Sequence, residues 1–506
     1  MALFKTVMRD TVRPIGIRNP LAKSFHRQAV QQNKQDLVSF LEPEQLVLSK
    51  GGAAKLVNTV RSMSELRREF VVVKVDLKNA FNEVNRAAII ENLQAEPSLQ
   101  HLAWFAAVSL SPEVGLESGG ELWGKAAEGE TQGDPKAGAF FCVAIQPHVR
   151  ELCREVREAE GVGVFGMDDG YVAGPEEVVF PAVERFERRL LESCGLVLQR
   201  TKTEVFSWEG VLPRDTPAGM VLAGREVEGE FLPGYMCYGV PVGSREYVRH
   251  VLSEKVEQIA EQAEKAVKVL EGERQSLWCV VKWSLSQRFE YWLQLSYPSD
   301  VREAAALLDR KLLRVLEACL GSQIPEGGAS DCVIEGPADS CIHGLSFQQL
   351  VVRLPIKMGG LGVRNQEQLR YAAFVGAVEQ CVPHIGVSTG LCPALAQQFG
   401  GDECFGRDMP ADTRWEVLIS SGCRLGQEFR EAWEVLRREA SQCAEWLDEE
   451  LDGALAQSVR GAGMGCTTGA TRKLVVEQLE KMWGKVLKSS LDQHADRRVR
   501  PMMSWT

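Results

Sequence analysis

Two adjacent aspartates, Asp168 and Asp169, are the residues of this chain whose types and spacing point most directly to chemistry. They lie in the largely apolar run Gly163–Ala173, which predicts a short hairpin with both carboxylates at its tip. Two like charges side by side repel each other, and a divalent cation removes that repulsion. Carboxylate oxygens suit Mg²⁺, which shares its other coordination positions with water and phosphates. For this motif alone, a solvated Asp-Asp-Gly turn is the alternative, because Asp and Gly accept unusual backbone angles.

A third carboxylate ends an apolar, β-branched run. Residues 70–76 read FVVVKVD and predict a buried strand that finishes at Asp76, 92 residues before Asp168. A lone Asp after a strand is commonly a helix cap or a loop residue. Between the two acidic segments, the chain turns sharply at Gly133-Asp134-Pro135 and enters an apolar helix over residues 137–145.

The order of these elements resembles the reverse transcriptases of non-LTR retrotransposons and their relatives. Six segments carry the resemblance: Arg13-Pro14-Ile15 (fingers motif), Asp76–Phe81 (motif A), Thr131–Pro135 (motif B), Met167–Asp169 (motif C), Gly195–Glu204 (motif D) and Tyr238–Gly243 (primer-grip region). A further segment, Leu354–Gly362, resembles one found downstream of the polymerase in some of these elements. Each motif alone is weak, and their shared order over residues 13–243 makes chance resemblance improbable.

The resemblance implies an α+β fold of the right-hand polymerase type, with reduced fingers, a palm built on an antiparallel sheet and a helical thumb. We expect partial fingers over residues 1–69, a palm with motifs A to E over 70–247 and a helical thumb over 248–345. A helical C-terminal region of unknown role would occupy 346–506. Within it, the spacing of apolar residues predicts an amphipathic helix ending near Leu447, with Glu428 on its polar face.

In two-metal phosphoryl transfer, ions about 4 Å apart require carboxylates that converge from different strands. Asp76 and Asp168 are the candidates, and the resemblance implies the same pair, with Asp169 as a less direct third carboxylate. All three would therefore be catalytic and would hold two Mg²⁺ ions. Lys202 and Arg13 match positions that contact or protonate the triphosphate in the family. An exposed strand-end lysine is the alternative for Lys202.

Three further residues match nucleotide-binding positions of the family. Phe81 lies five residues after Asp76, where an aromatic ring packs beneath the sugar and leaves no room for a 2′-hydroxyl. A core phenylalanine at a helix start is the alternative, and the two roles are compatible. Gln132 and Gly133 resemble the residues that contact the templating pair and the incoming nucleotide.

The chain departs from the family pattern at two motifs. The family usually has an aromatic residue two positions before the first aspartate of motif C, where this chain has Gly166, with Phe165 displaced by one position. Motif B continues with Lys136 where a Ser-Pro pair is common. The chain also starts close to the Arg-Pro-Ile motif, which leaves room for a protein partner that supplies the missing part of the fingers.

Composition bounds these expectations. A chain of 506 residues predicts several domains, and its net charge of −11 argues weakly against nucleic-acid binding. Residues 1–100 nevertheless carry 15 Lys and Arg against 10 Asp and Glu, and only a groove must neutralise phosphates. The 14 cysteines form no Cys-x-x-Cys pair, and no run of 18 apolar residues exists. We therefore expect an intracellular protein, nuclear or cytoplasmic, without a membrane span.

The sequence is best explained as an RNA-directed DNA polymerase of a retrotransposon, with an RNA template, a DNA primer and deoxynucleoside triphosphates as partners. Two other classes remain open. A catalytically inactive or domesticated RNA-binding protein on the same fold is favoured by the acidic charge and the short fingers. An unrelated palm enzyme, such as an RNA polymerase or a nucleotide cyclase, would be expected to have a small or hydrogen-bonding residue in place of Phe81.

Overall fold

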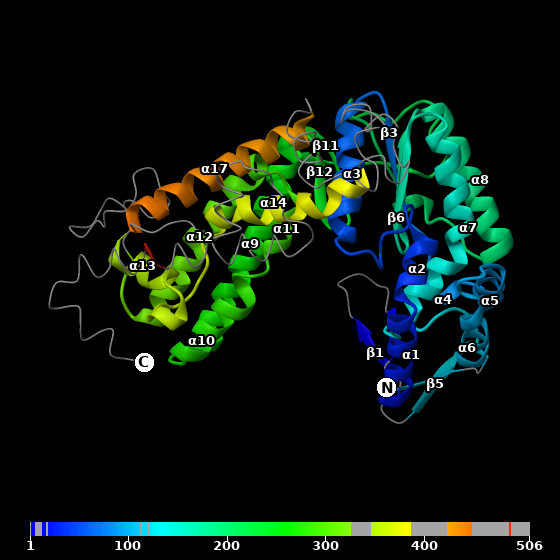
Figure 1. Cartoon of the computed structure of the whole chain (residues 1–506), viewed down its shortest axis with the longest axis horizontal. Coiled ribbons are helices and arrows are strands. Elements are labelled where there is room, and N and C mark those ends of the chain that lie inside the picture. The colour runs from blue at the N-terminus through cyan, green and yellow to red at the C-terminus, as the bar shows by residue number, and fades with distance from the viewer. Residues whose placement is uncertain are drawn as a thin grey trace. The chain divides into compact units, whose positions relative to one another are not determined.

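The computed structural model describes residues 2–5, 13–16, 19–111, 114–118, 121–324, 346–385, 423–447 and 485–486 (Figure 1). Contacts among them define two compact units, with a boundary between Gly243 and Ser244. The strands of the described chain lie before this boundary, and the described elements after it are helices. No helix in these ranges combines the length and the apolarity that crossing a bilayer requires.

A five-stranded sheet forms the middle of the first unit, in the order β6-β7-β3-β8-β9. Its strands are β3 (Val71–Val75), β6 (Val162–Gly166), β7 (Asp169–Gly174), β8 (Glu204–Phe206) and β9 (Val221–Leu222). All neighbouring pairs are antiparallel except β8–β9, which is parallel. The β-branched run predicted as a buried strand is β3, at the centre of the sheet. The predicted α+β class is confirmed, and the sheet is antiparallel except at one edge.

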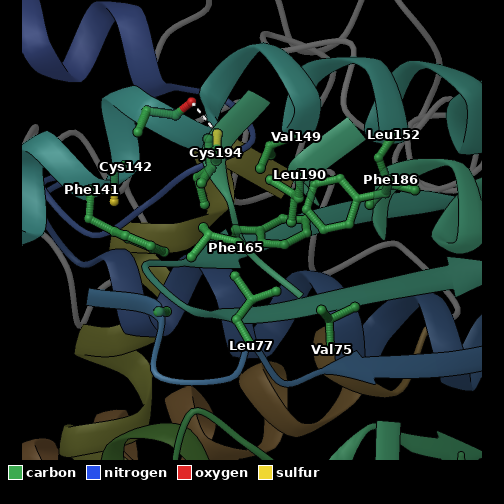
Figure 2. Packing of buried hydrophobic residues seen from close by; sticks show 14 of the residues in the cluster. Val75, Leu77, Phe141, Cys142, Val149, Leu152, Phe165, Phe186, Leu190 and Cys194 are labelled. Carbon is green, nitrogen blue, oxygen red and sulfur yellow. Dashed lines mark hydrogen bonds between the residues drawn. The ribbon is translucent and has the colours of Figure 1, made fainter. Parts of the chain in front are cut away.

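Four helices are associated with one face of this sheet. They are α5 (Arg86–Ala95), α6 (Gln100–Leu110), α7 (Ala137–Arg157) and α8 (Glu176–Cys194). Because side chains alternate along a strand, Val71, Val73 and Val75 all point to this face and join the core beneath the helices. Figure 2 shows this core around Phe165 and Phe186. Full burial of a valine or phenylalanine side chain stabilises the fold by roughly 1.5–3 kcal/mol.

The opposite face packs against a helix and a small second sheet. These elements are α3 (Gly52–Leu66), β10 (Gly224–Val227), β11 (Glu230–Cys237) and β12 (Val240–Gly243). The Tyr235 ring of β11 lies 6.4 Å from Tyr171 and 5.0 Å from Phe206, measured between ring centroids. Aromatic contacts therefore join the two sheets on the face opposite Val71, Val73 and Val75.

Shorter elements complete the first unit. They are β1 (Ala2–Lys5), β2 (Arg13–Gly16), α1 (Pro20–Gln32), α2 (Lys34–Leu41), α4 (Ala80–Glu83), β4 (Val114–Ser118), β5 (Glu121–Ala126) and the 3₁₀ turn η1 (Arg200–Lys202). β1 pairs with β2 and β4 with β5, both antiparallel. Helix α1 starts with Pro20 at its first position, and the Asn19 side chain accepts a hydrogen bond from the Leu21 amide at 2.9 Å.

The second unit contains α9 (Arg245–Val269), α10 (Arg274–Val280), the π-helical turn η2 (Val281–Leu285), α11 (Glu290–Leu295), α12 (Pro298–Leu320), α13 (Phe347–Arg353), the 3₁₀ turn η3 (Ile356–Met358), α14 (Gln366–Ile385) and α17 (Arg424–Leu447). The predicted amphipathic helix is α17, but the placement of Glu428 on its polar face was wrong. Glu428 is buried and accepts a hydrogen bond from the Ser299 amide at 3.3 Å. A partner on α12 thus replaces the water that the helical pattern predicted around this carboxylate.

Helix α8 provides a test of the core with a control on the same helix. Phe186 is fully buried, and its ring lies 5.7 Å from that of Phe165. We expect Phe186→Ala to lower the free energy of unfolding by about 3–5 kcal/mol, because it removes apolar contacts and leaves a cavity. Leu191, which is 53% exposed, is the control, and Leu191→Ala should change that energy by less than about 0.5 kcal/mol. Urea unfolding followed by circular dichroism compares the two variants, and equal losses would contradict the packing described.

Candidate active site

The pairing of three strands brings the predicted aspartates to one end of the central sheet. Val75 lies opposite Gly170, so Asp76, the next residue, continues the chain alongside Asp169 at the start of β7. Asp169 in turn pairs with Gly166 across the hairpin, and Asp168 lies in the two-residue loop between β6 and β7. Residues directly opposite each other in an antiparallel pair share a face. This places Asp76 and Asp169 on the face opposite the buried valines.

The carboxylates are close enough for their charges to act on one another. Burial raises the pKa of Asp169 to about 6, and the negative charges of Asp168 and Asp76 also raise it, while the Lys74 ammonium opposes them. All three aspartates are half-buried. A cluster of carboxylates that resist joint ionisation is the electrostatic setting that a bound cation stabilises.

A lysine next to this cluster was missed by the sequence analysis. Lys74 precedes Asp76 by two residues on β3 and therefore shares its face. Its Nζ lies 3.1 Å from Oε2 of Glu204, which is directly opposite on β8. The period-two alternation of the strand was the signal that could have identified it, because the residue two positions before a strand-end aspartate points the same way.

The backbone of Asp76 is tied to the segment that carries Lys202. The Gln199 amide donates a hydrogen bond of 2.7 Å to the Asp76 carbonyl oxygen, and the Asp76 amide donates to Oγ1 of Thr203 at 3.4 Å. Lys202 lies between these two anchors in η1, and its side chain is exposed. The structure thus holds the motif D segment beside motif A through hydrogen bonds to the main chain of Asp76 and presents the lysine to solvent.

The loop bearing Gln132 and Gly133 is fastened to the helix that bears Phe81. The Glu130 amide donates to the Phe81 carbonyl oxygen at 2.6 Å. Gly133 is exposed and has φ = 100°, a conformation that L side chains rarely adopt, and Gln132 is half-buried. The Phe81 ring lies 4.8 Å from the ring of Phe141 on α7 and is itself half-buried. Phe81 therefore packs on the core and still presents part of its surface beside this loop.

A buried ion pair and a buried hydrogen bond shape the same loop. Nζ of Lys136 lies 2.6 Å from Oε1 of Glu130, and both side chains are completely buried. Nδ1 of His26, on α1, lies 2.8 Å from Oδ1 of Asp134. The departure of motif B at Lys136 is thus accompanied by a carboxylate partner six residues earlier. Charged residues are rarely buried without such a partner, so sequence pattern alone predicted neither contact.

Motif C contains an unusual backbone angle, just before the Asp-Asp-Gly run. Met167 has φ = 67°, whereas Asp168, Asp169 and Gly170 all lie outside the left-handed region. Gly170 is required for space, because a Cβ at this position would lie 2.2 Å from Cε1 of Phe165. The glycine of the Asp-Asp-Gly run therefore lets the Phe165 ring pack across the hairpin. Its role is packing rather than turn formation.

Arg13 is the predicted site residue about which the structure says least. Its backbone belongs to β2, where it pairs with Lys5 of β1. The side chain lies outside the described part of the structure. Its expected contact with a triphosphate therefore stays a prediction.

The donor chemistry of the acidic cluster fits Mg²⁺. Within the ranges that the structure describes, no three His, Cys, Asp or Glu side chains are arranged to hold a metal ion by themselves. Where Mg²⁺ acts on phosphates, however, it is usually bound by one or two carboxylates together with substrate oxygens and water. Asp76, Asp168 and Asp169 offer such carboxylates, and a complete protein cage is not needed.

Comparison with known proteins agrees with this geometry. Residues 5–247 match the family model described as "Reverse transcriptase (RNA-dependent DNA polymerase)". A reverse transcriptase domain with the corresponding polymerase fold is therefore present, as the sequence predicted. A search of curated proteins gives no match.

Similar solved structures include two yeast telomerases. Telomerase from Candida albicans in complex with the TWJ fragment of telomeric RNA is 12% identical, with a TM-score of 0.31, over 58% of this chain and 51% of that chain. Apo telomerase from Candida tropicalis is 13% identical, with a TM-score of 0.33, over 59% and 51%. The chain thus spans about half the length of these structures.

The buried ion pair at the motif B loop can be tested by a double-mutant cycle. We expect Lys136→Met to destabilise the protein by about 3–5 kcal/mol, because it removes the ammonium from a carboxylate that has left water. Glu130→Gln should also destabilise the protein, because it removes the carboxylate from an ammonium that has left water. The double variant should lose less than the sum of the two, and thermal melting measures all three. Strictly additive losses would show that the two side chains are not coupled.

Proposed function

We propose that this protein is an RNA-directed DNA polymerase of a retrotransposon, of the non-LTR type, which adds deoxynucleotides to a DNA primer on an RNA template. The observation that carries the proposal is the convergence of Asp76, Asp168 and Asp169 at one end of the sheet, where their charges interact. The reverse transcriptase family match over residues 5–247 supports it independently.

In this proposal, Asp76 and Asp168 hold two Mg²⁺ ions, and Asp169 is a nearby third carboxylate. Such ions, when bound, lower the pKa of the attacking hydroxyl and stabilise the charge of the leaving pyrophosphate. The strand pairing keeps the carboxylates in place, so little reorganisation is needed when substrate binds. Lys74, ion-paired with Glu204, supplies a fixed positive charge on the same face.

The remaining predicted residues act on the nucleotide. Lys202 and Arg13 are proposed to contact the triphosphate, where fixed cations stabilise charge spread over the phosphate oxygens. Gln132 and Gly133 are proposed to contact the base pair and the nucleotide, and the positive φ of Gly133 supports a close backbone approach. The half-buried Phe81 ring is proposed to lie beneath the sugar.

Primer extension on an RNA template tests the acidic cluster. We expect Asp76→Asn and Asp168→Asn each to reduce extension by about 10³-fold or more, because a neutral amide fills the same space but binds Mg²⁺ poorly. Affinity for the primer–template, measured by fluorescence anisotropy, should change little. The exposed Asp215 is the matched control, and Asp215→Asn should retain activity. If either cluster variant kept wild-type turnover, the assignment of these carboxylates would be wrong.

Sugar selection tests whether the enzyme makes DNA. We expect Phe81→Ala to raise the use of ribonucleotides relative to deoxynucleotides by about 10²-fold, because it opens space for a 2′-hydroxyl. Phe180, a core residue of α8, provides the control for loss of packing. Phe180→Ala should lower the melting temperature and leave the sugar ratio unchanged. An unchanged ratio in a folded Phe81→Ala variant would remove the main support for DNA over RNA synthesis.

A further inference from the structure

Gly166 leaves space beside the acidic cluster that another residue fills. It is the last residue of β6, lies two positions before Asp168 and pairs with Asp169, so it shares the face of Asp169 and Asp76. Its φ lies outside the left-handed region. A Cβ at this position would lie 2.6 Å from Cε2 of Tyr238 and 3.2 Å from Cδ1 of Leu56. Lack of space, rather than backbone conformation, therefore requires glycine here.

Phe165, the adjacent aromatic residue, cannot occupy this space. Successive strand residues point to opposite faces, so Phe165 points to the helix-covered core. There it is fully buried, and its ring centroid lies 5.7 Å from that of Phe186. Figure 2 labels both residues within this core. The shift of the aromatic by one position thus moves its ring to the wrong side of the sheet for contact with Asp169.

Tyr238 reaches the space at Gly166 from the turn between β11 and β12. Its φ is 49°, in the left-handed region, and the following Gly239 has φ = 80°. Its amide donates a hydrogen bond of 2.7 Å to the hydroxyl of Tyr171, which lies on β7 two residues after Asp169. The hydroxyl of Tyr171 donates to the Met236 carbonyl oxygen at 3.3 Å. These hydrogen bonds connect the turn to the strand that carries the carboxylate.

The charges of the acidic cluster also act on the half-buried Tyr238 side chain. Burial raises the pKa of its hydroxyl, and the negative charges of Asp169 and Asp168 raise it further. The phenol therefore stays neutral at physiological pH and adds no negative charge to the three carboxylates. A neutral ring packs against the strand end without increasing the repulsion there.

We propose that Tyr238 is a positioning residue for the polymerase reaction. Motif C has no aromatic side chain at Gly166, and the Tyr238 ring, which comes from the β11–β12 turn, takes that place. The ring packs against the end of β6 and holds the hairpin that presents Asp168 and Asp169. This inference rests on the proposed function, since it assigns a role within the same site. A displacement of reacting groups by about 1 Å costs on the order of 10²-fold in rate, so loss of this support should reduce turnover.

A ring-exchange experiment tests the proposal in the full-length protein. Tyr238→Ala should reduce kcat for primer extension by about 10²-fold, with primer–template affinity unchanged. Gly166→Phe alone should also reduce kcat, because two rings then compete for one space. The double variant carries one ring in that space and should recover to within about tenfold of wild type. Tyr238→Phe keeps the ring and should stay within about threefold, which separates the ring from the hydroxyl.

Two controls distinguish positioning from general damage. Phe231 lies on the same strand, β11, and its ring packs toward Gly210 and Gly224, so Phe231→Ala should leave kcat unchanged. Melting curves give the fraction of each variant that is folded at the assay temperature. If the role of Tyr238 were purely structural, kcat per folded molecule would be unaltered. An independent loss of kcat in each single variant, without recovery in the double variant, would overturn the proposal.

The test also separates this inference from the proposed function. If the wild-type protein extended no primer under any condition, the proposed function would fail. The packing of Tyr238 against Gly166 would then be decided by melting alone. Single variants that each lower the melting temperature, with the double variant close to wild type, would support it. Additive losses would refute it.

Discussion

The candidate site depends on the register of β3 against β7. With Val75 opposite Gly170, Val71, Val73 and Val75 enter the core beneath the helices, while Lys74 and Asp76 point to the other face. A slip of one residue would exchange the two faces. It would turn these three valines toward the site and the carboxylates into the apolar core, where an ionised group without a partner is strongly disfavoured. Hydrophobic burial on one side of the sheet thus fixes the position of the charges on the other.

The charged groups around the site are balanced in two different ways. Lys136 and Glu130 are buried as an ion pair, in which each neutralises the other. Asp169 is different, because burial and the negative charges of Asp168 and Asp76 raise its pKa, while the Lys74 ammonium, itself ion-paired with Glu204, opposes them. Retained repulsion of this kind lowers stability, and perturbed carboxylates of this kind gather at functional sites. Under the proposed function, this is where a cation and a phosphate-bearing substrate would bind.

The motif C hairpin is held by contacts from separate elements. Met167 adopts a positive φ, which costs free energy for a residue with a side chain. The methyl carbon of Met167 lies close to Gly138 at the start of α7, where an added Cβ would come within 2.9 Å of it. Leu56 of α3 and Tyr238 lie next to Gly166 in the same way. Packing on several sides maintains the strained loop, and the close approach at both glycines explains why larger residues are absent.

Local sequence signals predicted most of the framework. The valine run, the hairpin around Asp168 and the helix after Pro135 follow from side-chain periodicity and turn residues, and the structure contains all three. The same signals misplaced Glu428 on a polar face. The deciding residue, Ser299, lies 129 positions away along the chain, outside the local pattern that was considered.

The sequence by itself determined the buried strand that ends at Asp76 and the hairpin that carries Asp168 and Asp169, because alternation and β-branching act over a few neighbouring residues. Only the tertiary structure decided what surrounds those carboxylates. The pairing of Lys74 with Glu204 and the packing of Tyr238 at Gly166 join residues 130 and 72 positions apart. Whether a charge is neutralised or a space is filled depends on atoms brought together by folding, which no local pattern records.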